Sequence, residues 1–479
     1  MLKEVAEYLS RRGVAAYLVG GYVRDLLLGR ETADVDIAVH GAPEIARDIG
    51  RAFKGKFVLL DEISQVARVV IPPSGVSGPG WHLDLSPLKG DIEHNLAQRD
   101  FTINAMAVEL TEGVEKGSRL AIIDPWGGQR DLGQRLLRVV KGTVFQDDAL
   151  RLLRAVRLAA ELGLAVDMET EVLIRRDSHL ISGVSGERVR EELLRLLALP
   201  GADRRLSYLD SLSLLTAIIP ELAQAKGVEQ PREHHWDVFQ HSIETVGAVE
   251  GVLREGPWEY GGEDIINSVP VFQGSESYFH QEVARGSSRL ILLKLAALLH
   301  DVAKPQTKTV EEGGRTRFLG HTGLGAEKTE SILERLRFSN REVKMMTTMV
   351  KYHLRPGQMS QEGMPTRRAI YRYFRDTEGV GIDILYLSLA DFLASRGPEI
   401  DSGEWREFTG LVDYVLSRQG EVEQASPPKV VDGNDLMRLF DLKPGPELGR
   451  LLEQVKEAQA AGELGNREEA LEFVGKILS

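Results

Sequence analysis

The spacing of apolar residues changes near Phe145 and divides the chain into two kinds of segment. Before Phe145, the short β-rich runs AYLV, DVDIAV, KFVLL and ARVVI alternate with amphipathic stretches such as APEIARDIGRAF. After it, segments such as DDALRLLRAVRLAAELGL and GERVREELLRLLAL repeat apolar residues at helical spacing, and strand patterns almost vanish. The pattern predicts an α/β head followed by a mostly α-helical remainder.

Two breaks divide the helical part. A polar stretch with several Gly and Ser residues runs from Glu255 to Ser288, and we interpret it as a mobile insertion. The second break is the Pro-containing ASPPKVV at 425–431. We therefore expect a head at 1–145, a helical neck at 146–225, a third domain at 226–425 and a small C-terminal helical module at 426–479.

Composition limits the ligands and partners. The 479 residues include no cysteine, so any metal must be held by histidine and carboxylate. A formal net charge of -13 argues against a protein that coats nucleic acid with bulk positive charge. No apolar run is long enough for a membrane span, and MLKEVAEYLSRRG lacks the apolar core of a signal peptide. We expect a cytoplasmic protein with no membrane partner.

Two glycines and two aspartates in the head predict a phosphoryl-transfer site. Gly20 and Gly21 separate a predicted strand from a helix, where backbone N–H groups can approach phosphate, and Arg24 adds positive charge. Asp34 and Asp36 alternate with apolar residues in ADVDIAV and so project from one face of a strand. Adjacent carboxylates repel unless divalent cations neutralise them, and two cations suit in-line attack on a nucleotide phosphate.

The pattern GG-x-VRD followed by D-x-D on a strand resembles the DNA polymerase β superfamily of nucleotidyltransferases. Four further blocks follow in order: QRDFTINAMAV, IIDPWGGQRDL, FQDDALRLLRAVRLAAELGL and SGERVREELLRLL. Together they resemble the class II tRNA nucleotidyltransferases, a family shared by CCA-adding enzymes and bacterial poly(A) polymerases. The resemblance covers nearly the whole chain. It implies an enzyme that adds nucleotides from CTP and ATP to the 3′ end of tRNA, with Asp34 and Asp36 as catalytic ligands of Mg²⁺.

The resemblance also implies a protein template for the incoming base. We expect Asp148 and Arg151 to share one face of a helix, because they are three residues apart. A carboxylate can accept from the exocyclic amine of cytosine or adenine while an arginine donates to the ring, an order that uracil reverses. The alternative is an ordinary amphipathic helix with internal salt bridges. The nucleotide-binding residues expected in all are Gly20, Gly21, Arg24, Arg99, Asp100, Asn104, Asp148, Arg151, Arg154 and Arg157.

A short connection bears on which nucleotides are added. Asp84, a candidate third carboxylate, is joined to Arg99 by only LSPLKGDIEHNLAQ. CCA-adding members of the family carry a longer flexible segment here, and members that add only the two cytidines lack it. The resemblance thus favours CC addition, unless the Gly/Pro-rich IPPSGVSGPGW at 71–81 replaces that segment, in which case full CCA addition stays open.

A second site is expected in the third domain. HHWDVFQHS, LAALLHDVAKP, FLGHTGLGAE, VKYHLRPG and LSLADFLA resemble, in this order, the HD superfamily of metal-dependent phosphohydrolases. Such a site could hydrolyse phosphomonoesters or 2′,3′-cyclic phosphates and repair tRNA ends, and a purely structural HD domain is the alternative. His321 and His353 could bind a second metal or a substrate phosphate, beside Lys304. The ligands expected for a divalent Mg, Mn, Ni or Fe ion are His241, His300, Asp301 and Asp391.

The expected partners are tRNA, CTP and ATP, with no stable protein partner. The nearest rival function is that of a bacterial poly(A) polymerase, but the acidic ending GELGNREEALEFVGKILS lacks the basic extension common in those enzymes. A rival of another class is an HD phosphohydrolase or nucleotide sensor with a binding-only head. The intact pair of Asp34 and Asp36 argues against that interpretation.

Overall fold

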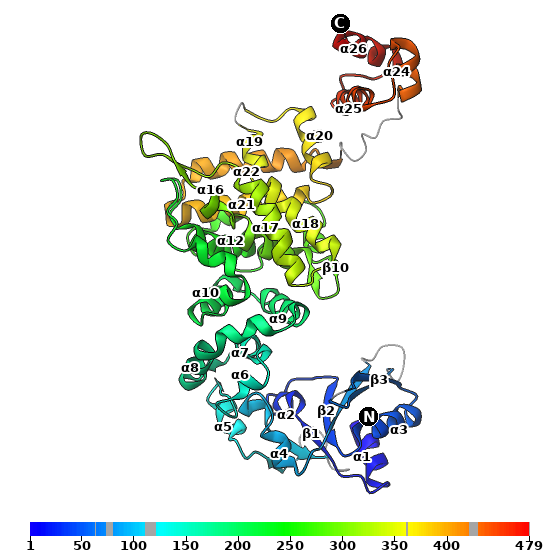
Figure 1. Ribbon diagram of the computed structural model, residues 1–479, viewed down its shortest axis with the longest axis vertical. Helices are drawn as coiled ribbons and strands as arrows, with labels where there is room; N and C mark the ends of the chain where they lie inside the picture. The colour runs from blue at the N-terminus through cyan, green and yellow to red at the C-terminus, as the bar shows by residue number, and fades with distance from the viewer. Residues whose placement is uncertain (63, 73–79, 111–120, 361–362, 421–429, 479) are drawn as a thin grey trace. The chain divides into compact units, whose positions relative to one another are not determined.

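The computed structural model describes residues 1–62, 64–72, 80–110, 121–360, 363–420 and 430–478 (Figure 1). The chain forms two compact units, Met1–Val184 with Leu212–Ala217 and Ser185–Ser211 with Ile218–Ser479. The residues predicted as neck therefore divide between the two units. Most of the predicted boundary at 425–431, and most of the segment at 71–81, lies outside the described residues. None of the described helices is long and apolar enough to cross a membrane.

The head contains a mixed sheet of seven strands in the order β3-β4-β5-β2-β1-β6-β7. Strands β2 and β5 run parallel, whereas the other neighbouring pairs are antiparallel. The strands are β1 (Ala16–Val19), β2 (Asp34–Val39), β3 (Lys56–Asp61), β4 (Val66–Ile71), β5 (Trp81–Pro87), β6 (Ala107–Glu109) and β7 (Ile122–Ile123). All four β-rich runs predicted from sequence are strands, which confirms the α/β head.

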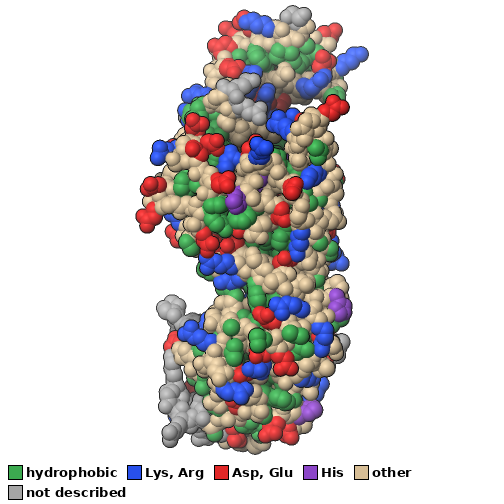
Figure 2. Space-filling model, turned by 90° about the vertical axis from the view of Figure 1, so that its left-hand side faces the viewer, with side chains coloured by type: hydrophobic (Ala, Val, Ile, Leu, Met, Phe, Trp, Pro, Cys, Tyr) green, Lys and Arg blue, Asp and Glu red, His purple; other side chains and the backbone are tan. Residues whose placement is uncertain are grey.

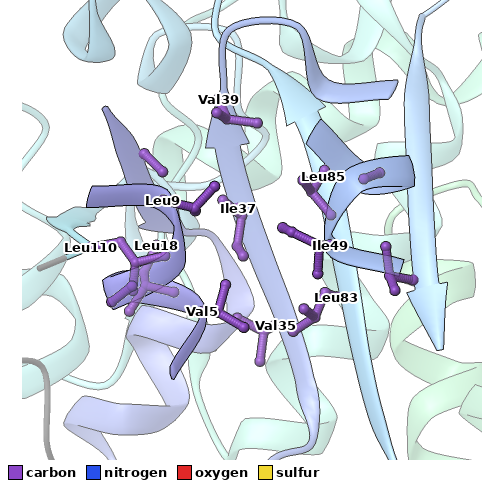
Figure 3. Close-up of a cluster of buried hydrophobic side chains, with 14 of the residues drawn as sticks. Val5, Leu9, Leu18, Val35, Ile37, Val39, Ile49, Leu83, Leu85 and Leu110 are labelled. Atoms are coloured by element: carbon purple, nitrogen blue, oxygen red, sulfur yellow. The ribbon is translucent and has the colours of Figure 1, made fainter. Parts of the chain in front are cut away.

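Two amphipathic helices, α1 (Leu2–Ser10) and α3 (Ala42–Ala52), cover one face of the sheet. Leu9 of α1 and Ile49 of α3 pack with Ile37 of β2 in this core (Figure 3). Side chains alternate along a strand, so burying Val35, Ile37 and Val39 turns Asp34 and Asp36 to the opposite face. The core of the head therefore fixes the direction of the two predicted catalytic carboxylates.

Further helices complete the first unit. A smaller apolar cluster that includes Ala38, Leu96 and Ala107 packs on the face that carries the aspartates. These helices are α2 (Gly21–Leu27), α4 (Ile92–Leu96), the 3-10 turn η1 (Thr102–Asn104), α5 (Gly128–Gly133), α6 (Val144–Asp147), α7 (Leu150–Leu162), α8 (Met168–Asp177) and the 3-10 turn η2 (Ser178–Gly183). The short strands β8 (Leu136–Leu137) and β9 (Ala165–Val166) pair in parallel.

Five helices form the centre of the second unit: α12 (Val238–Val252), α15 (Arg289–Leu299), α17 (His321–Arg335), α18 (Asn340–Tyr352) and α21 (Gly381–Arg396). The sequence LILLKLAALL of α15 is apolar on every side, as expected of a helix that is buried all round. Its Lys294 is buried with Glu250, 2.8 Å from Nζ to Oε1. The helices that surround this centre are α9 (Gly186–Ala198), α10 (Ala202–Ser211), α13 (Glu263–Asn267), α14 (Ser275–Phe279), α16 (Lys304–Thr307), α19 (Arg355–Gln358), α20 (Arg367–Asp376) and α22 (Ser402–Leu416).

Several small elements complete the chain. The helices α24 (Gly433–Phe440), α25 (Pro446–Ala460) and α26 (Arg467–Leu478) share an apolar cluster of their own. α11 (Leu215–Ile218) spans the boundary between the two units, and η3 (Pro220–Ala225) and η4 (Gly397–Glu399) are 3-10 turns of the second unit. Two hairpins pair β10 (Glu282–Ala284) with β11 (Ser287–Ser288) and β12 (Thr309–Val310) with β13 (Thr316–Arg317).

The polar stretch at 255–288 is part of the packed second unit, so the prediction of a mobile insertion is wrong. Trp258, Ile265 and Phe279 are buried. Trp405 of α22 donates from Nε1 to the carbonyl of Ile265 at 2.8 Å, and Tyr278 Oη donates to Asp383 Oδ2 at 2.6 Å. A few apolar anchors hold a segment whose average composition is polar.

Candidate active site and metal centre

The turn between β1 and α2 brings Gly20 and Gly21 against the predicted carboxylates. Gly20 has φ 70, and a Cβ atom there would lie 2.6 Å from Arg99 Nη1 and 2.7 Å from Asp36 Oδ2. The N–H of Gly21 donates to Asp36 Oδ2 at 3.2 Å. Glycine is therefore needed at position 20 for both its backbone conformation and its lack of a side chain. Four predicted site residues meet at this turn.

The parallel register of β2 and β5 sets the carboxylates side by side. Asp36 lies opposite Asp84, and Asp34 lies opposite His82. Arg68 of β4 donates to both oxygens of Asp84, from Nε at 2.6 Å and from Nη2 at 2.7 Å. His82 Nδ1 is 3.0 Å from Asp34 Oδ1. Because Asp84 is held by this two-pronged ion pair, Asp34 and Asp36 are the better candidates for metal ligands.

The electrostatics of Asp36 favour a cation beside it. Burial raises the pKa of Asp36, and the neighbouring Asp84 and Asp34 raise it further, while Arg99 opposes the shift. A partly buried carboxylate next to two others is stabilised in its ionised form by divalent cations. The residues present therefore fit a divalent metal site on this face of β2.

A chain of hydrogen bonds joins four other predicted residues. Arg24 Nη1 donates to Asn104 Oδ1 at 2.8 Å, and Asn104 Nδ2 donates to Asp100 Oδ1 at 3.1 Å. Asp100 Oδ2 accepts from Arg154 Nη2 at 2.9 Å. Burial would raise the pKa of Asp100, but Arg154 and Asn104 hold it below its usual value. The chain connects α2, η1 and α7, so these residues have fixed relative positions.

The predicted template helix differs from expectation at its start. α7 begins at Leu150, and Asp148 precedes it with extended backbone, φ -155 and ψ 105. Asp148 Oδ1 accepts from the N–H of Leu150 at 3.1 Å. The prediction that Asp148 and Arg151 share a helical face is therefore wrong, because a carboxylate just before a helix pairs with its free N–H groups. The predicted row of arginines also differs, since buried Arg157 forms an ion pair with Glu161.

Arg151 keeps an unsatisfied donor. Its Nη2 donates to the carbonyl of Gln98 at 3.1 Å. Its Nη1 is buried and has no hydrogen-bond partner among the described residues. A buried guanidinium nitrogen without a partner is costly, so a ligand acceptor at this point would be stabilising. Arg151 is therefore the strongest candidate for base contact on α7.

The four predicted ligands of the second site come together from three helices. His241 lies in α12, His300 and Asp301 directly follow α15, and Asp391 lies in α21. His241 Nε2 is 3.0 Å from Asp391 Oδ1 and 3.2 Å from His300 Nε2. His300 Nε2 is 3.1 Å from Asp301 Oδ2. Facing nitrogen and oxygen atoms at these distances fit a divalent metal ion.

The cluster is largely buried, and its surroundings are charged. Burial would lower the pKa of His300, but Asp301 and Asp391 raise it to about 10. Despite their burial, both aspartates keep a pKa well below the usual value, Asp301 because His300 lies beside it and Asp391 because of His241 and His300. Burial, together with the neighbouring His300, lowers the pKa of His353 to about 3. Lys304 Nζ approaches Asp301 Oδ2 at 2.6 Å.

A pocket of about 240 Å³ opens onto the cluster. Phe392 and Phe408 lie in its wall as a stacked pair, with ring centroids 5.1 Å apart. The pocket is lined by His234, Lys304, His353, Leu354, Gly357, Ser388, Asp391, Phe392, Ser395, Arg396 and Phe408. A small phosphoester could therefore reach the candidate metal ligands.

Sequence reasoning missed several residues around both sites. Arg68 is the one charged residue in the apolar strand VARVVI, which was a usable sign, whereas His82 gave none. Gln98 contributes through its backbone carbonyl, which no sequence pattern marks. At the second site, His234 lines the pocket, although only His241 of the same block, HHWDVFQHS, was predicted as a site residue.

Comparison with known families accounts for four stretches of the chain. Residues 16–138 match the Poly A polymerase head domain, and residues 238–392 match the HD domain. Residues 163–226 match the family described as "Probable RNA and SrmB-binding site of polymerase A". Residues 427–474 match domain 2 of a tRNA nucleotidyltransferase family.

Two curated relatives cover nearly the full chain. An A-adding tRNA nucleotidyltransferase of Deinococcus radiodurans is 35% identical over 96% of this chain and 94% of its own length. A CC-adding tRNA nucleotidyltransferase of Thermus thermophilus is 33% identical over 96% of this chain and 93% of its own length.

Solved structures share the fold. A CCA-adding enzyme in complex with CTP has a TM-score of 0.64 at 22% identity, covering 100% of this chain and 94% of that one. The Thermotoga maritima CCA-adding enzyme complexed with tRNA has a TM-score of 0.60 at 22% identity, covering 100% of this chain and 95% of that one.

Proposed function

This chain belongs to the tRNA nucleotidyltransferase family, and we propose that it adds cytidine from CTP to tRNA 3′ ends and stops after two additions. Membership of the family follows from relatives 35% and 33% identical that the chain matches almost from end to end. The name of the first relative specifies A and that of the second specifies CC, so identity alone does not choose the nucleotide. The choice of cytidine is the proposal.

The short connection between β5 and Arg99 is the observation that supports cytidine addition. β5 ends at Pro87 and α4 begins at Ile92, so only the turn at 88–91 separates them. Asp91 caps α4 by accepting from the N–H of His94 at 2.7 Å. The connection is folded throughout and has no room for the long flexible segment that accompanies adenosine addition in CCA-adding enzymes. This short connection supports CC addition, while A addition and full CCA addition, with the segment at 71–81 in place of the missing loop, are the competing outcomes.

We propose that Asp34 and Asp36 hold two Mg²⁺ ions. These ions would supply the positive charge that activates the tRNA 3′-hydroxyl and stabilises the phosphate during in-line attack. The N–H of Gly21 orients Asp36 by a hydrogen bond. Because Gly20 has no side chain, Arg99 can lie close to the same carboxylate. Attack of the hydroxyl oxygen on the α-phosphorus forms the new P–O bond and releases pyrophosphate.

Nucleotide selection is assigned to Arg151 with Asp148. The free Nη1 of Arg151 can donate to the ring nitrogen or carbonyl of cytosine, and the Asp148 carboxylate can accept from its exocyclic amine. The hydrogen-bonded chain of Arg24, Asn104, Asp100 and Arg154 shapes the surrounding nucleotide site. Arg157, a buried residue of α7, is proposed to support this site from within the helix.

The domain boundaries remain proposals. We assign the head to 1–145, the neck to 146–225, the HD domain to 226–425 and the C-terminal tRNA-binding module to 426–479. The family matches at 16–138, 238–392 and 427–474 fall within the head, the HD domain and the C-terminal module, and the match at 163–226 covers most of the neck and ends one residue beyond it, which supports the assignment.

For the HD domain we propose a divalent-metal phosphohydrolase that opens 2′,3′-cyclic phosphates at RNA ends. The ligand cluster of His241, His300, Asp301 and Asp391 and its adjoining pocket support this activity. Water would add to phosphorus while the P–O3′ bond breaks, and a proton passes to O3′. The product carries a phosphate on O2′ and a free 3′-hydroxyl, the group that the head extends.

Incorporation with single-nucleotide resolution tests the proposed nucleotide choice. The full chain with Mg²⁺ is incubated with tRNA lacking CCA in CTP alone and in CTP with ATP, and with tRNA ending in CC in ATP alone. We expect two additions in both CTP reactions and none with ATP alone. A third addition would replace the proposal with CCA addition, and extension of only the CC-ending tRNA would replace it with A addition.

A further inference from the structure

A pocket of about 470 Å³ lies between α10, α12 and the segment that follows α12, all within the second unit. It shares no lining residue with the pocket beside the HD cluster. Its described lining residues include four carboxylates, from Asp203, Glu244, Glu250 and Glu259, but one basic side chain, from Arg204. The pocket is therefore acidic, and it takes no part in either candidate site.

Two of the four carboxylates are already paired with a cation. Glu250 is buried with Lys294, 2.8 Å from Oε1 to Nζ. The exposed Glu259 forms an ion pair with Arg204. The negative charge that is left in the pocket therefore belongs to the other two carboxylates.

Asp203 and Glu244 have no basic partner at ion-pair distance in the described part of the chain, although the charge of Arg205 attracts Asp203. The Asp203 carboxylate lies on α12 at Gly247, where a Cβ atom would be 3.1 Å from its Oδ2. Glu244 is 9% exposed, and its Oε1 accepts from Gln240 Nε2 at 2.8 Å. Burial raises the pKa of both carboxyl groups, so a cation between them would stabilise their ionised forms.

Two aromatic rings form a corner of the same pocket. The ring centroids of Trp258 and Tyr260 are 5.1 Å apart, and the ring planes meet at 79°. Aromatic faces attract cations, so rings beside unpaired carboxylates suit an organic ammonium ion.

The indole of Trp258 adds a second requirement. Trp258 is 7% exposed, and its Nε1 is buried without a hydrogen-bond partner among the described residues. A buried N–H that lacks an acceptor is costly, so a ligand that brings an oxygen atom to this wall of the pocket is stabilised.

We propose that this pocket binds a small amino alcohol, an aliphatic molecule with one protonated amine and one hydroxyl group. The ammonium group donates to Asp203 and Glu244 beside the aromatic corner. The hydroxyl oxygen accepts from Trp258 Nε1. The unpaired carboxylates repel phosphate, which disfavours nucleotides here. A plain amine and a neutral diol are the competing ligands, and each leaves one of these protein groups without a partner.

Three compounds of matched shape test the proposal on the full chain. The probe is trans-4-aminocyclohexanol; cyclohexane-1,4-diol replaces its ammonium group with a hydroxyl, and cyclohexylamine lacks its hydroxyl. Isothermal titration calorimetry at neutral pH measures the binding of each. We expect one site per chain and an affinity for the amino alcohol at least about tenfold above that for either of the other two.

Variants locate the site. Asp203→Asn with Glu244→Gln keeps the side-chain shapes but removes both charges, and should lower the affinity for the amino alcohol at least about tenfold. Trp258→Phe keeps an aromatic ring but removes the N–H, and should abolish the preference for the amino alcohol over cyclohexylamine. Glu255→Gln is the control, because Glu255 faces His280 at 3.4 Å and does not line the pocket, and it should bind as the parent does.

Three results would overturn the proposal: no binding of the amino alcohol to the parent chain, equal binding of the diol, or unchanged binding in the Asp203→Asn, Glu244→Gln variant. Equal binding of cyclohexylamine by the parent would overturn the assignment of an amino alcohol and leave a site for plain amines. Circular dichroism spectra that match the parent's confirm that the variants fold, and the comparison of the three compounds on the parent chain needs no variant.

Discussion

Gly20 has a backbone conformation that favours glycine, and it lies against Arg99 and Asp36 of the proposed active site in the head. We expect Gly20→Ala to lower incorporation at least about a hundredfold, because its Cβ would displace Arg99 and Asp36, and small misplacements of reacting groups have effects of that size. Gly13→Ala is the matched control, since Gly13 has φ 68 and nothing within 4 Å of its Cβ position. It should cost about 1–2 kcal/mol of stability and leave incorporation unchanged. Equal incorporation by the two variants would contradict the role of this turn.

The same neighbourhood marks how far sequence reasoning reaches at single residues. Gly20, Gly21 and Asp36 were identified because their spacing is local, and the structure brings them into contact. The ion pair of Arg68 with Asp84 was not, because it depends on β4 and β5 lying next to each other in one register. Register between strands far apart in sequence is set by the whole sheet and leaves no local trace.

Helix α7 is the element on which nucleotide choice depends. We expect Arg151→Ala to narrow the preference for CTP over UTP by about 10- to 100-fold, because a base-reading hydrogen bond contributes about 1–3 kcal/mol of discrimination. The readout is kcat/KM for each nucleotide on tRNA lacking CCA. Arg175→Ala on α8 is the control, since that side chain is exposed and pairs with Glu171. Unchanged selectivity after Arg151→Ala would assign the base contact elsewhere.

The helix itself was predicted well from periodicity, but its first residue was not. The apolar spacing of LRLLRAVRLAAEL identifies α7, whereas Asp148 has an extended backbone because its carboxylate pairs with the N–H of Leu150. A run of helix-compatible residues does not reveal at which residue the helix begins when an acidic side chain caps its first N–H groups. The expectation about Asp148 failed for this reason.

The segment at 255–288 is anchored to α22 by one buried tryptophan. Trp405→Ala should destabilise the protein by about 3–5 kcal/mol, through lost burial and a cavity. Trp405→Phe keeps most of the packing but removes the donor to Ile265 and Ser268, and should cost about 1–3 kcal/mol. Trp126→Ala is the control, because Trp126 is 39% exposed. Urea unfolding followed by circular dichroism measures all three, and a loss no larger for Trp405→Ala than for Trp126→Ala would restore the mobile-insertion interpretation.

At the scale of the whole molecule, a family that processes tRNA is combined here with a formal net charge of -13. Figure 2 shows Lys and Arg side chains interspersed with Asp and Glu over the visible face. Bulk charge therefore cannot be the main attraction for RNA, and local groups of basic residues must supply it. The order of the domains was readable from sequence. The division of the neck between two compact units was not, because it depends on packing between distant helices.

The two candidate sites lie in different compact units, so their chemistries should be separable. Asp391→Ala should leave addition to tRNA with a free 3′-hydroxyl unchanged and abolish addition to tRNA that ends in a 2′,3′-cyclic phosphate. Asp36→Ala should lose at least about a thousandfold in addition to both, about 4 kcal/mol of transition-state stabilisation, because a metal ligand is removed, yet still open the cyclic phosphate. Electrophoresis of end-labelled tRNA after each reaction resolves the four combinations. The opposite outcome would be loss of addition to tRNA with a free 3′-hydroxyl in Asp391→Ala, with an unchanged circular dichroism spectrum. It would mean that the head needs the HD site and that the two activities are not independent.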